Sequence, residues 1–449
     1  MLATAGAAKQ EIGVSMERPH PLFNRWQEDW SRLANPVVPA EPLDALKYAP
    51  FDRPDDYLSF GLTQRLRYEL NDIPGLGLTG ARADDYFLSR TELHADLRLQ
   101  SVQAFVQLES VLAPGKVRLA PSDENRLDVE QAFVAGVRPV PGGVLKARIG
   151  RQQFAFDLQR FVSVRDGPNV RQSFDGAWFD FETPRWRLIG YWTQPVVARD
   201  ARPFDDRSSD RWTFSGVRIE RRVFGDGELS AYWSRFRQEG ATYGGVRGTD
   251  DRHVFDARFA GSLGPIDWDL EAMGQVGGFA GRDIRAWGFG ARFGRAFKAQ
   301  WQPRFGLQLD GASGDGDPRD RKLTTFNPLF PNGAYLTLAG YTGYANFLHL
   351  KPSMTVHPTP RLAATFAIAT QWRMTTADAV YVQPSSSLMG TAGRAGKYTG
   401  AYGQVRFDYL VSPHLTAALE AVRFETSRSL KTVGARSADY LGVELKFAW

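Results

Sequence analysis

Hydrophobic and polar positions alternate strictly along much of the chain. The pattern is clearest in the final segment, where one face would carry Leu441, Val443, Leu445, Phe447 and Trp449. A period of two places successive side chains on opposite faces of a strand, so the pattern predicts an all-β protein. A soluble sandwich would turn its charged face outward, whereas a transmembrane barrel turns its apolar face to lipid and its charged face to water. The aromatic last strand and the many repeats favour the transmembrane barrel.

Alternating segments after residue 56 number about eighteen, the even number that bacterial outer-membrane barrels require. We expect strands near 57–70, 85–99, 101–112, 125–138, 143–153, 174–182, 186–197, 211–223, 228–237, 251–263, 266–278, 283–295, 301–312, 344–357, 360–373, 397–411, 414–427 and 437–449. Short polar joints alternate with long joints at 71–84, 113–124, 154–173, 198–210, 238–250, 313–343, 374–396 and 428–436. This alternation predicts antiparallel strands with both termini in the periplasm.

Residues 1–55 do not alternate and form a separate, non-barrel leader in this prediction, with the barrel at 56–449. Seven prolines in this leader argue against a long strand. Trp26, Trp30 and Leu33 are spaced for one face of a short helix over 24–33. The leader is either disordered or a periplasmic piece tucked at the barrel mouth, and the aromatic stripe favours packing. No secretory signal is visible at the start, so we expect a mature sequence.

Composition is compatible with a barrel although mean hydropathy, at −0.35, would suggest a soluble protein. Only every second residue of a barrel strand faces lipid, which keeps the mean low. No stretch approaches the roughly 18 apolar residues of a helical span. Aromatic residues make up 13% of the chain, and many lie near predicted strand ends, as interfacial girdles require. Cysteine is absent, which excludes disulfides and thiolate chemistry.

The formal net charge is +5, and most of the cations are arginines. Nucleic-acid binding is not expected, because 50 acidic residues are interspersed and no basic helix or RNA-binding motif appears. Arginine forks suit carboxylates and phosphates, so an acidic solute or lipopolysaccharide is the more natural partner. We also expect no enzyme activity, because the motifs of hydrolases, metalloproteases and phosphate-binding loops are missing. A catalytic role for His94 is less natural than a braced histidine in a polar lumen.

By parity, the charged face of the predicted strands would line the lumen. The expected lining includes Arg65, Arg67, Arg90, Glu92, His94, Asp96, Arg126, Asp128, Glu130, Arg148, Arg304, Lys351, Arg361 and Arg406. One wall would be acidic through Asp267, Asp269 and Glu271, beside Arg285 and Arg292. One interpretation is that these charges form cross-strand ladders that brace the wall. The other is that a minority of arginines stay unpaired and select anions, most plausibly among Arg65, Arg90, Arg126, Arg148, Arg165 and Arg171.

The 154–173 joint is the strongest candidate for a loop that narrows the lumen. It carries Arg160, Arg165 and Arg171 around a Gly167-Pro168 turn signal. The alternative is a solvated extracellular loop, since loops usually run over surfaces. A second joint gathers Asp315, Asp317 and Asp320, which resembles a calcium loop without the EF-hand order. An ordinary acidic turn explains the same residues, so no cofactor is expected beyond a candidate structural calcium.

Several runs along the chain are specific enough to compare with a known family. They are 57–61 with 65–69, 93–97, 125–128 with 131–133, 149–152, 312–315, 325–331 and, in the leader, 27–30 and 42–48. The most specific run is Val164-Arg165-Asp166-Gly167-Pro168-Asn169-Val170-Arg171-Gln172-Ser173-Phe174-Asp175-Gly176. Together they resemble the bacterial alginate export family of outer-membrane barrels over nearly the whole chain.

The resemblance implies an eighteen-stranded barrel whose arginine-rich constriction passes the polyuronate alginate. We therefore expect a passive Gram-negative outer-membrane channel for acidic polysaccharide or small anionic solutes. Outer-membrane lipid and lipopolysaccharide would surround it, and periplasmic export proteins are candidate partners. The substrate does not follow from the fold. A general unselective porin and a structural or docking barrel of an envelope machine remain as alternatives.

Overall fold

Eighteen antiparallel strands close into a barrel in the computed structural model, which describes residues 18–80, 83–223, 225–394 and 396–449. The expectations for residues 1–17 lie outside the described residues. Closure occurs where the first and last barrel strands pair from Thr63 opposite Ala448 to Asn71 opposite Tyr440. The main chains of Leu62 and Trp449 extend this pairing with two reciprocal hydrogen bonds of 2.8 Å. The aromatic last residue therefore sits at the seam of the barrel.

The barrel strands follow one another around the ring in chain order. They are β2 (Tyr57–Asn71), β3 (Asp84–Leu99), β4 (Val102–Leu112), β5 (Asn125–Val140), β6 (Gly143–Gln152), β7 (Phe174–Glu182), β8 (Trp186–Val197), β10 (Trp212–Arg222), β11 (Glu228–Tyr243), β12 (Val246–Leu263), β13 (Ile266–Phe279), β14 (Arg282–Ala296), β15 (Arg304–Ala312), β17 (Phe347–Thr359), β18 (Leu362–Trp372), β21 (Tyr398–Ser412), β22 (Leu415–Thr426) and β23 (Ala438–Ala448).

Shorter elements lie in the connections and in the N-terminal segment. They are β1 (Ala49–Pro50), β9 (Arg207–Ser208), β16 (Lys322–Leu323), β19 (Tyr381–Val382), β20 (Ser386–Ser387), α1 (Asp44–Lys47), α2 (Arg428–Lys431) and the 3-10 helices η1 (Arg25–Gln27), η2 (Ser31–Ala34), η3 (Pro74–Gly77) and η4 (Gly333–Tyr335). In the described part of the chain, no helix is both long and apolar enough to cross a membrane.

One predicted loop is wrong. The sequence suggested a long joint at 238–250, but β11 and β12 continue through this region and form a tall hairpin. Gly244 and Gly245 make the two-residue turn with φ of 55° and 81°, a conformation that glycine adopts without steric cost. A register shift between Gln238 and Ala241 interrupts the alternation there, which hid the continuing strand. The other barrel strands start and end within three residues of the expected positions.

Charged and apolar faces separate as the alternation predicted. On β3 the side chains of Arg90 and Glu92 are buried inside the barrel, whereas Phe87 and Leu93 are exposed on the outside. The same outward exposure of large apolar side chains recurs on other strands, for example at Leu445 of β23. An apolar outer band is what a bilayer requires of a barrel.

Two long loops fold into the lumen. The loop between β6 and β7 meets the loop between β15 and β17, where Val162 and Phe330 form a parallel bridge. The side chains of Phe161 and Phe330 are buried at this contact. Asp166 of the first loop binds Arg90 on β3, while Arg160 binds Asp269 on β13. Because β3 and β13 lie on opposite sides of the ring, this loop crosses the lumen. The inward-loop interpretation is confirmed, and the solvated-loop alternative for 154–173 is wrong.

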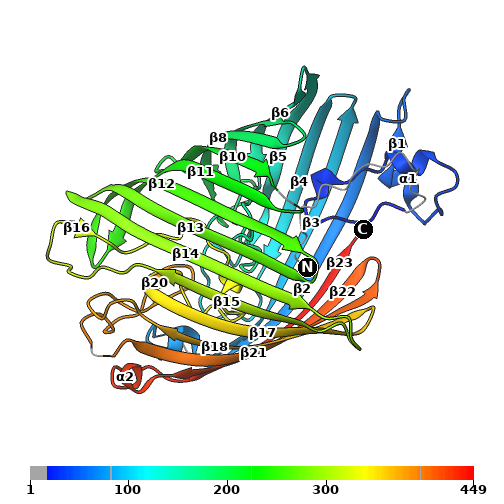
Figure 1. Cartoon of the computed structure of the whole chain (residues 1–449). Helices are drawn as coiled ribbons and strands as arrows, with labels where there is room; N and C mark the ends of the chain where they lie inside the picture. The colour runs from blue at the N-terminus through cyan, green and yellow to red at the C-terminus, as the bar shows by residue number, and fades with distance from the viewer. Residues whose placement is uncertain (1–17, 81–82, 224, 395) are drawn as a thin grey trace.

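The N-terminal segment packs on the barrel end that carries the short turns, here called the short-turn end. Figure 1 shows α1 and β1 near the C-terminus, whereas α2 and β16 lie at the opposite, loop end. The expected 24–33 helix is replaced by η1 and η2, because Glu28 adopts an extended conformation between them. The Glu28 carboxylate binds Arg25 and the indole of Trp30. Among the described residues, the leader is therefore ordered against the barrel.

Candidate functional site

A cavity of about 640 Å³ opens at the loop end of the barrel. Its walls come from the inward loop, the β8–β10 connection and the β11–β12 hairpin. The charged lining consists of Arg165, Arg171, Arg199, Arg211 and Arg247 with Asp210 and Glu239. Arg171 is paired with Asp166 and Glu92, and Arg211 lies 4.0 Å from Asp210, so the excess positive charge of the lining lies on Arg165, Arg199 and Arg247.

Arg165 of the inward loop lines this cavity. Its backbone has a φ of 55°, and its N–H donates to the hydroxyl of Ser163 at 3.0 Å. The left-handed conformation costs a non-glycine residue about 1 kcal/mol or more, and the turn at Gly167-Pro168 follows directly. Its guanidinium makes no ion pair or hydrogen bond with any described residue. Burial lowers the pKa of Arg165, and no carboxylate acts against that effect.

Arg199 and Arg247 share this lack of ion-pair partners within the described ranges. Arg199 uses only its backbone N–H, which donates to Asp206 at 2.7 Å. The Arg247 side chain lies beside Gly240 on the β11–β12 hairpin. A Cβ atom added to Gly240 would lie 3.2 Å from the Arg247 guanidinium. Unpaired guanidinium groups keep their hydrogen-bond donors for a ligand, and their forks match carboxylates.

The remaining arginines of the inward loop are anchored by carboxylates. Asp166 binds Arg171 at 2.7 Å and Arg90 at 2.5 Å. Burial acts to raise the pKa of Asp166, but Arg171 and Arg90 hold it well below its usual range. Arg171 also binds Glu92 at 2.9 Å and Glu130 at 3.5 Å. These pairs fix the loop to the wall and leave Arg165 as its free cation.

Most of the expected lumen residues form ladders on the wall. Arg65 and Arg67 bind Glu444, and Arg67 also binds Glu420. Further pairs are Asp96 with Arg98, Asp128 with Arg151, Arg304 with Asp267, and Arg406 with Glu420. Lys351 donates instead to the backbone oxygens of Tyr335 and Leu336. This arrangement matches the bracing interpretation for these residues.

Two expected lining residues face the N-terminal segment. The guanidinium of Arg148 lies 4.6 Å from the ring centre of Trp26 and 5.2 Å from that of Phe133. His94 stacks on Phe105 and lies close to Arg25. Among the described residues, neither side chain forms an ion pair with a carboxylate. They line the part of the lumen that the leader occupies.

Three placements differ from the prediction. Arg126 is 71% exposed and binds Asp200 at 3.2 Å, because register shifts in the β4–β5 pairing around Glu109 break the alternation. Arg361 is exposed in the turn between β17 and β18, beyond the strand wall. Arg285 is exposed on the outward face of β14, so it does not pair with the acidic wall. The wall's partners are Arg160, Arg258 and Arg304.

The structure does not gather the candidate calcium ligands. Asp317 accepts from the backbone of Arg319 at 3.0 Å, and Asp320 accepts from that of Lys322 at 2.7 Å. Asp315 instead lies 3.7 Å from Arg282. In the described part of the chain, these three do not form one of the groups of acidic side chains close enough to share an ion. Their contacts are those of an acidic turn.

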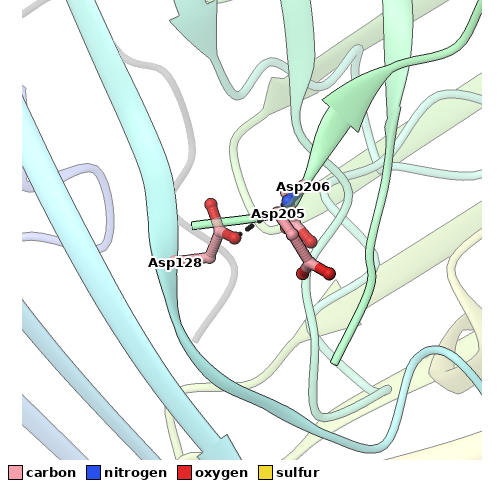
Figure 2. A group of neighbouring side chains, drawn as sticks. All are labelled: Asp128, Asp205 and Asp206. Carbon is pink, nitrogen blue, oxygen red and sulfur yellow. Dashed lines mark hydrogen bonds between the residues drawn. The ribbon is translucent and has the colours of Figure 1, made fainter. Parts of the chain in front are cut away.

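A different acidic group lies near the arginine-lined cavity. Figure 2 shows Asp128 on β5 beside Asp205 and Asp206 of the β8–β10 connection, and the Asp206 N–H donates to Asp128 at 2.9 Å. Burial raises the pKa of Asp206 to about 6, and the charge of Asp128 acts in the same direction. Keeping Asp206 ionised at neutral pH therefore costs folding free energy.

This cost predicts a pH-dependent stability. Because the folded state raises the pKa of an acid, the wild type should gain stability relative to Asp206→Asn as the pH falls through about 6 towards 3.8. Melting temperatures of both proteins in detergent between these pH values measure the effect. Asp210→Asn, which removes an exposed carboxylate, should keep the wild-type dependence. Parallel pH profiles of the wild type and Asp206→Asn would contradict the assignment.

Sequence parity missed Arg199, Arg211 and Arg247, which belong to the cavity. The first two lie in the β8–β10 connection, and the third lies at the start of β12, in a stretch that the sequence analysis assigned to a loop. The sequence signal that could have identified them is that arginines recur in the connections near the inward loop.

Comparison with known proteins places the chain in a class. No curated protein matches the sequence. Solved structures with the same fold include OpdK from Pseudomonas aeruginosa, with 13% identity, 87% of this chain and 98% of that chain covered and a TM-score of 0.58. OccK2 (OpdF) from Pseudomonas aeruginosa, in complex with glucuronate, has 13% identity, coverages of 87% and 97% and a TM-score of 0.57. A BenF-like porin from Pseudomonas fluorescens Pf-5 has 11% identity, coverages of 87% and 98% and a TM-score of 0.60.

These likenesses show that the closed barrel has the fold of outer-membrane β-barrel porins. The family model described as alginate export matches residues 56–444. The chain therefore belongs to the alginate export family and is an outer-membrane channel.

Proposed function

We propose that this channel passes small anionic solutes of the uronate or aromatic carboxylate class. The observation that carries the proposal is the set of three guanidinium groups, on Arg165, Arg199 and Arg247, without ion pairs among the described residues at one cavity. A carboxylate entering the cavity would gain charge-assisted hydrogen bonds that the wall does not already satisfy. The glucuronate in the OccK2 structure is an example of such a solute.

Small solutes are favoured here over an alginate polymer. Two inward loops and the N-terminal segment occupy the lumen, and Phe161 and Phe330 are buried where the two loops meet. A polysaccharide would need these segments to move apart, whereas a single uronate needs much less displacement. An acidic polysaccharide remains the second substrate class, supported by the family to which the chain belongs.

The N-terminal segment acts in this proposal as a plug of the short-turn end. Phe23 lies against the guanidinium of Arg171 and the ammonium of Lys446, at 4.9 and 5.6 Å from its ring centre. The backbone oxygen of Trp26 accepts from Arg98 and Gln103 on the barrel wall. Short turns face the periplasm in outer-membrane barrels, so the plug and both termini would be periplasmic, within reach of export proteins. Lipid and lipopolysaccharide would surround the outer face.

Solute entry into proteoliposomes tests the proposal. Glucuronate should enter faster than glucose, because the two differ little in size and the difference lies in the charge that the cavity recognises. Swelling rates in iso-osmotic solutions of each solute provide the measurement. Equal rates would support a general porin, and the absence of entry for both would support a structural or docking barrel.

A further inference from the structure

A second acidic group lies deep in the lumen, away from the arginine-lined cavity. It consists of Asp157 on the inward loop, Asp256 on β12 and Glu271 on β13, here called the lumen triad. One oxygen from each carboxylate lies within 4.8 Å of the others. The triad joins the loop that crosses the lumen to two neighbouring wall strands.

Two members of the triad have arginine partners. Asp157 binds Arg218 at 2.6 Å and Arg258 at 2.9 Å, and Glu271 binds Arg160. Asp269 uses the same cations, since it binds Arg258 at 2.6 Å and Arg160 at 3.2 Å.

Further carboxylates contact these three arginines, namely Glu220, Glu228 and Asp310. Carboxylates therefore outnumber the guanidinium groups, and the surplus negative charge falls on Asp256.

Asp256 has no hydrogen-bond partner for either carboxylate oxygen among the described residues, although its side chain is only 5% exposed. The hydroxyl of Tyr232, a residue 4% exposed, is likewise buried and without a partner in the described part of the chain. Tyr232 and Asp256 face each other across the β11–β12 pairing. A buried, uncompensated carboxylate costs several kcal/mol, so Asp256 needs a cation or a proton. The unpartnered tyrosine oxygen beside it points to a site that accepts a ligand.

We propose that the lumen triad binds a hard divalent cation of the calcium class. Calcium takes oxygen ligands at about 2.3–2.6 Å, so ligand atoms on opposite sides of the ion lie at most about 5 Å apart. The triad oxygens satisfy this limit. The Tyr232 hydroxyl and water would complete the shell. The bound ion would neutralise Asp256 and tie Asp157 of the inward loop to β12 and β13. The site is independent of the arginine-lined cavity proposed to recognise anions.

Calcium binding to the full-length protein in detergent tests the inference. After removal of divalent ions with a chelator, terbium luminescence sensitised by nearby aromatic side chains should rise on binding and fall when calcium competes. Asp256→Asn should weaken calcium binding by about tenfold or more, because ligand charge sets affinity at such sites. Asp256 makes no side-chain hydrogen bond with a described residue, so this variant removes none. Heat-modifiable electrophoretic mobility of the variant would show that its barrel remains closed. Asp320→Asn, in an acidic turn outside the site, should bind as the wild type does.

Two results would overturn the inference. A wild type that takes up no calcium at millimolar concentration would show that Asp256 is instead protonated. Unchanged binding in Asp256→Asn would place the ion elsewhere.

Discussion

Removing residues 18–50 is expected to raise the single-channel conductance several-fold. These residues contact the barrel from inside its short-turn end, through Arg25 to the backbone oxygen of Trp449 and through Trp26 to Arg148. Ion flow through a narrowed passage is limited by its open cross-section and by the charges along it. Recordings from single proteins in planar bilayers, wild type against the deletion, measure the change.

A milder pair of substitutions separates plugging from a general loosening of the barrel. Phe23→Ala with Trp26→Ala keeps the chain intact but removes the two aromatic side chains that meet Arg171, Lys446, Arg148 and Phe133. Conductance should rise, or the closed periods should shorten. Trp186→Ala removes an exposed aromatic ring from a strand end and should change neither. Identical conductance in the deletion and the wild type would refute the plug.

Replacing Arg165, Arg199 and Arg247 together with glutamine is expected to lower the anion-to-cation permeability ratio by about tenfold. A unit charge 4 Å from a passing ion contributes about 4 kcal/mol at an effective dielectric constant of about 20. Losing about 1.4 kcal/mol of this preference suffices for a tenfold change. The effect should grow at low salt, where screening is weaker. Reversal potentials under a salt gradient give the ratio.

The matched control removes the same number of charges from the outside of the barrel. Arg221, Arg285 and Arg295 are exposed on β10 and β14, and glutamine at these positions should leave the ratio unchanged. If both triple variants shift the ratio equally, net charge and not the cavity sets selectivity.

The barrel was predictable because its physics is local. Alternation between lipid and water fixes the orientation of each side chain, so Arg65, Arg67, Arg90 and Glu92 could be assigned to the interior from the sequence. The assignment failed at Arg126 because extra residues in β5 shift its register against β4 and change the parity without a sequence signal of their own.

The candidate site was predictable only in part. The Gly167-Pro168 turn and its arginines marked the inward loop, but which arginine stays unpaired depends on contacts between distant segments. Arg90 meets Asp166, and Arg160 meets Glu271, only because the loop crosses the lumen. Similarly, the expected 24–33 helix ignored the carboxylate of Glu28, whose contacts with Arg25 and Trp30 form in the folded leader.

The reversal potential of the wild-type channel under an about tenfold potassium chloride gradient tests the central claim most directly. An arginine-lined entrance with a surplus of guanidinium groups predicts a potential close to the chloride equilibrium value. A potential at zero, or one close to the potassium equilibrium value, would contradict an anion-selective channel.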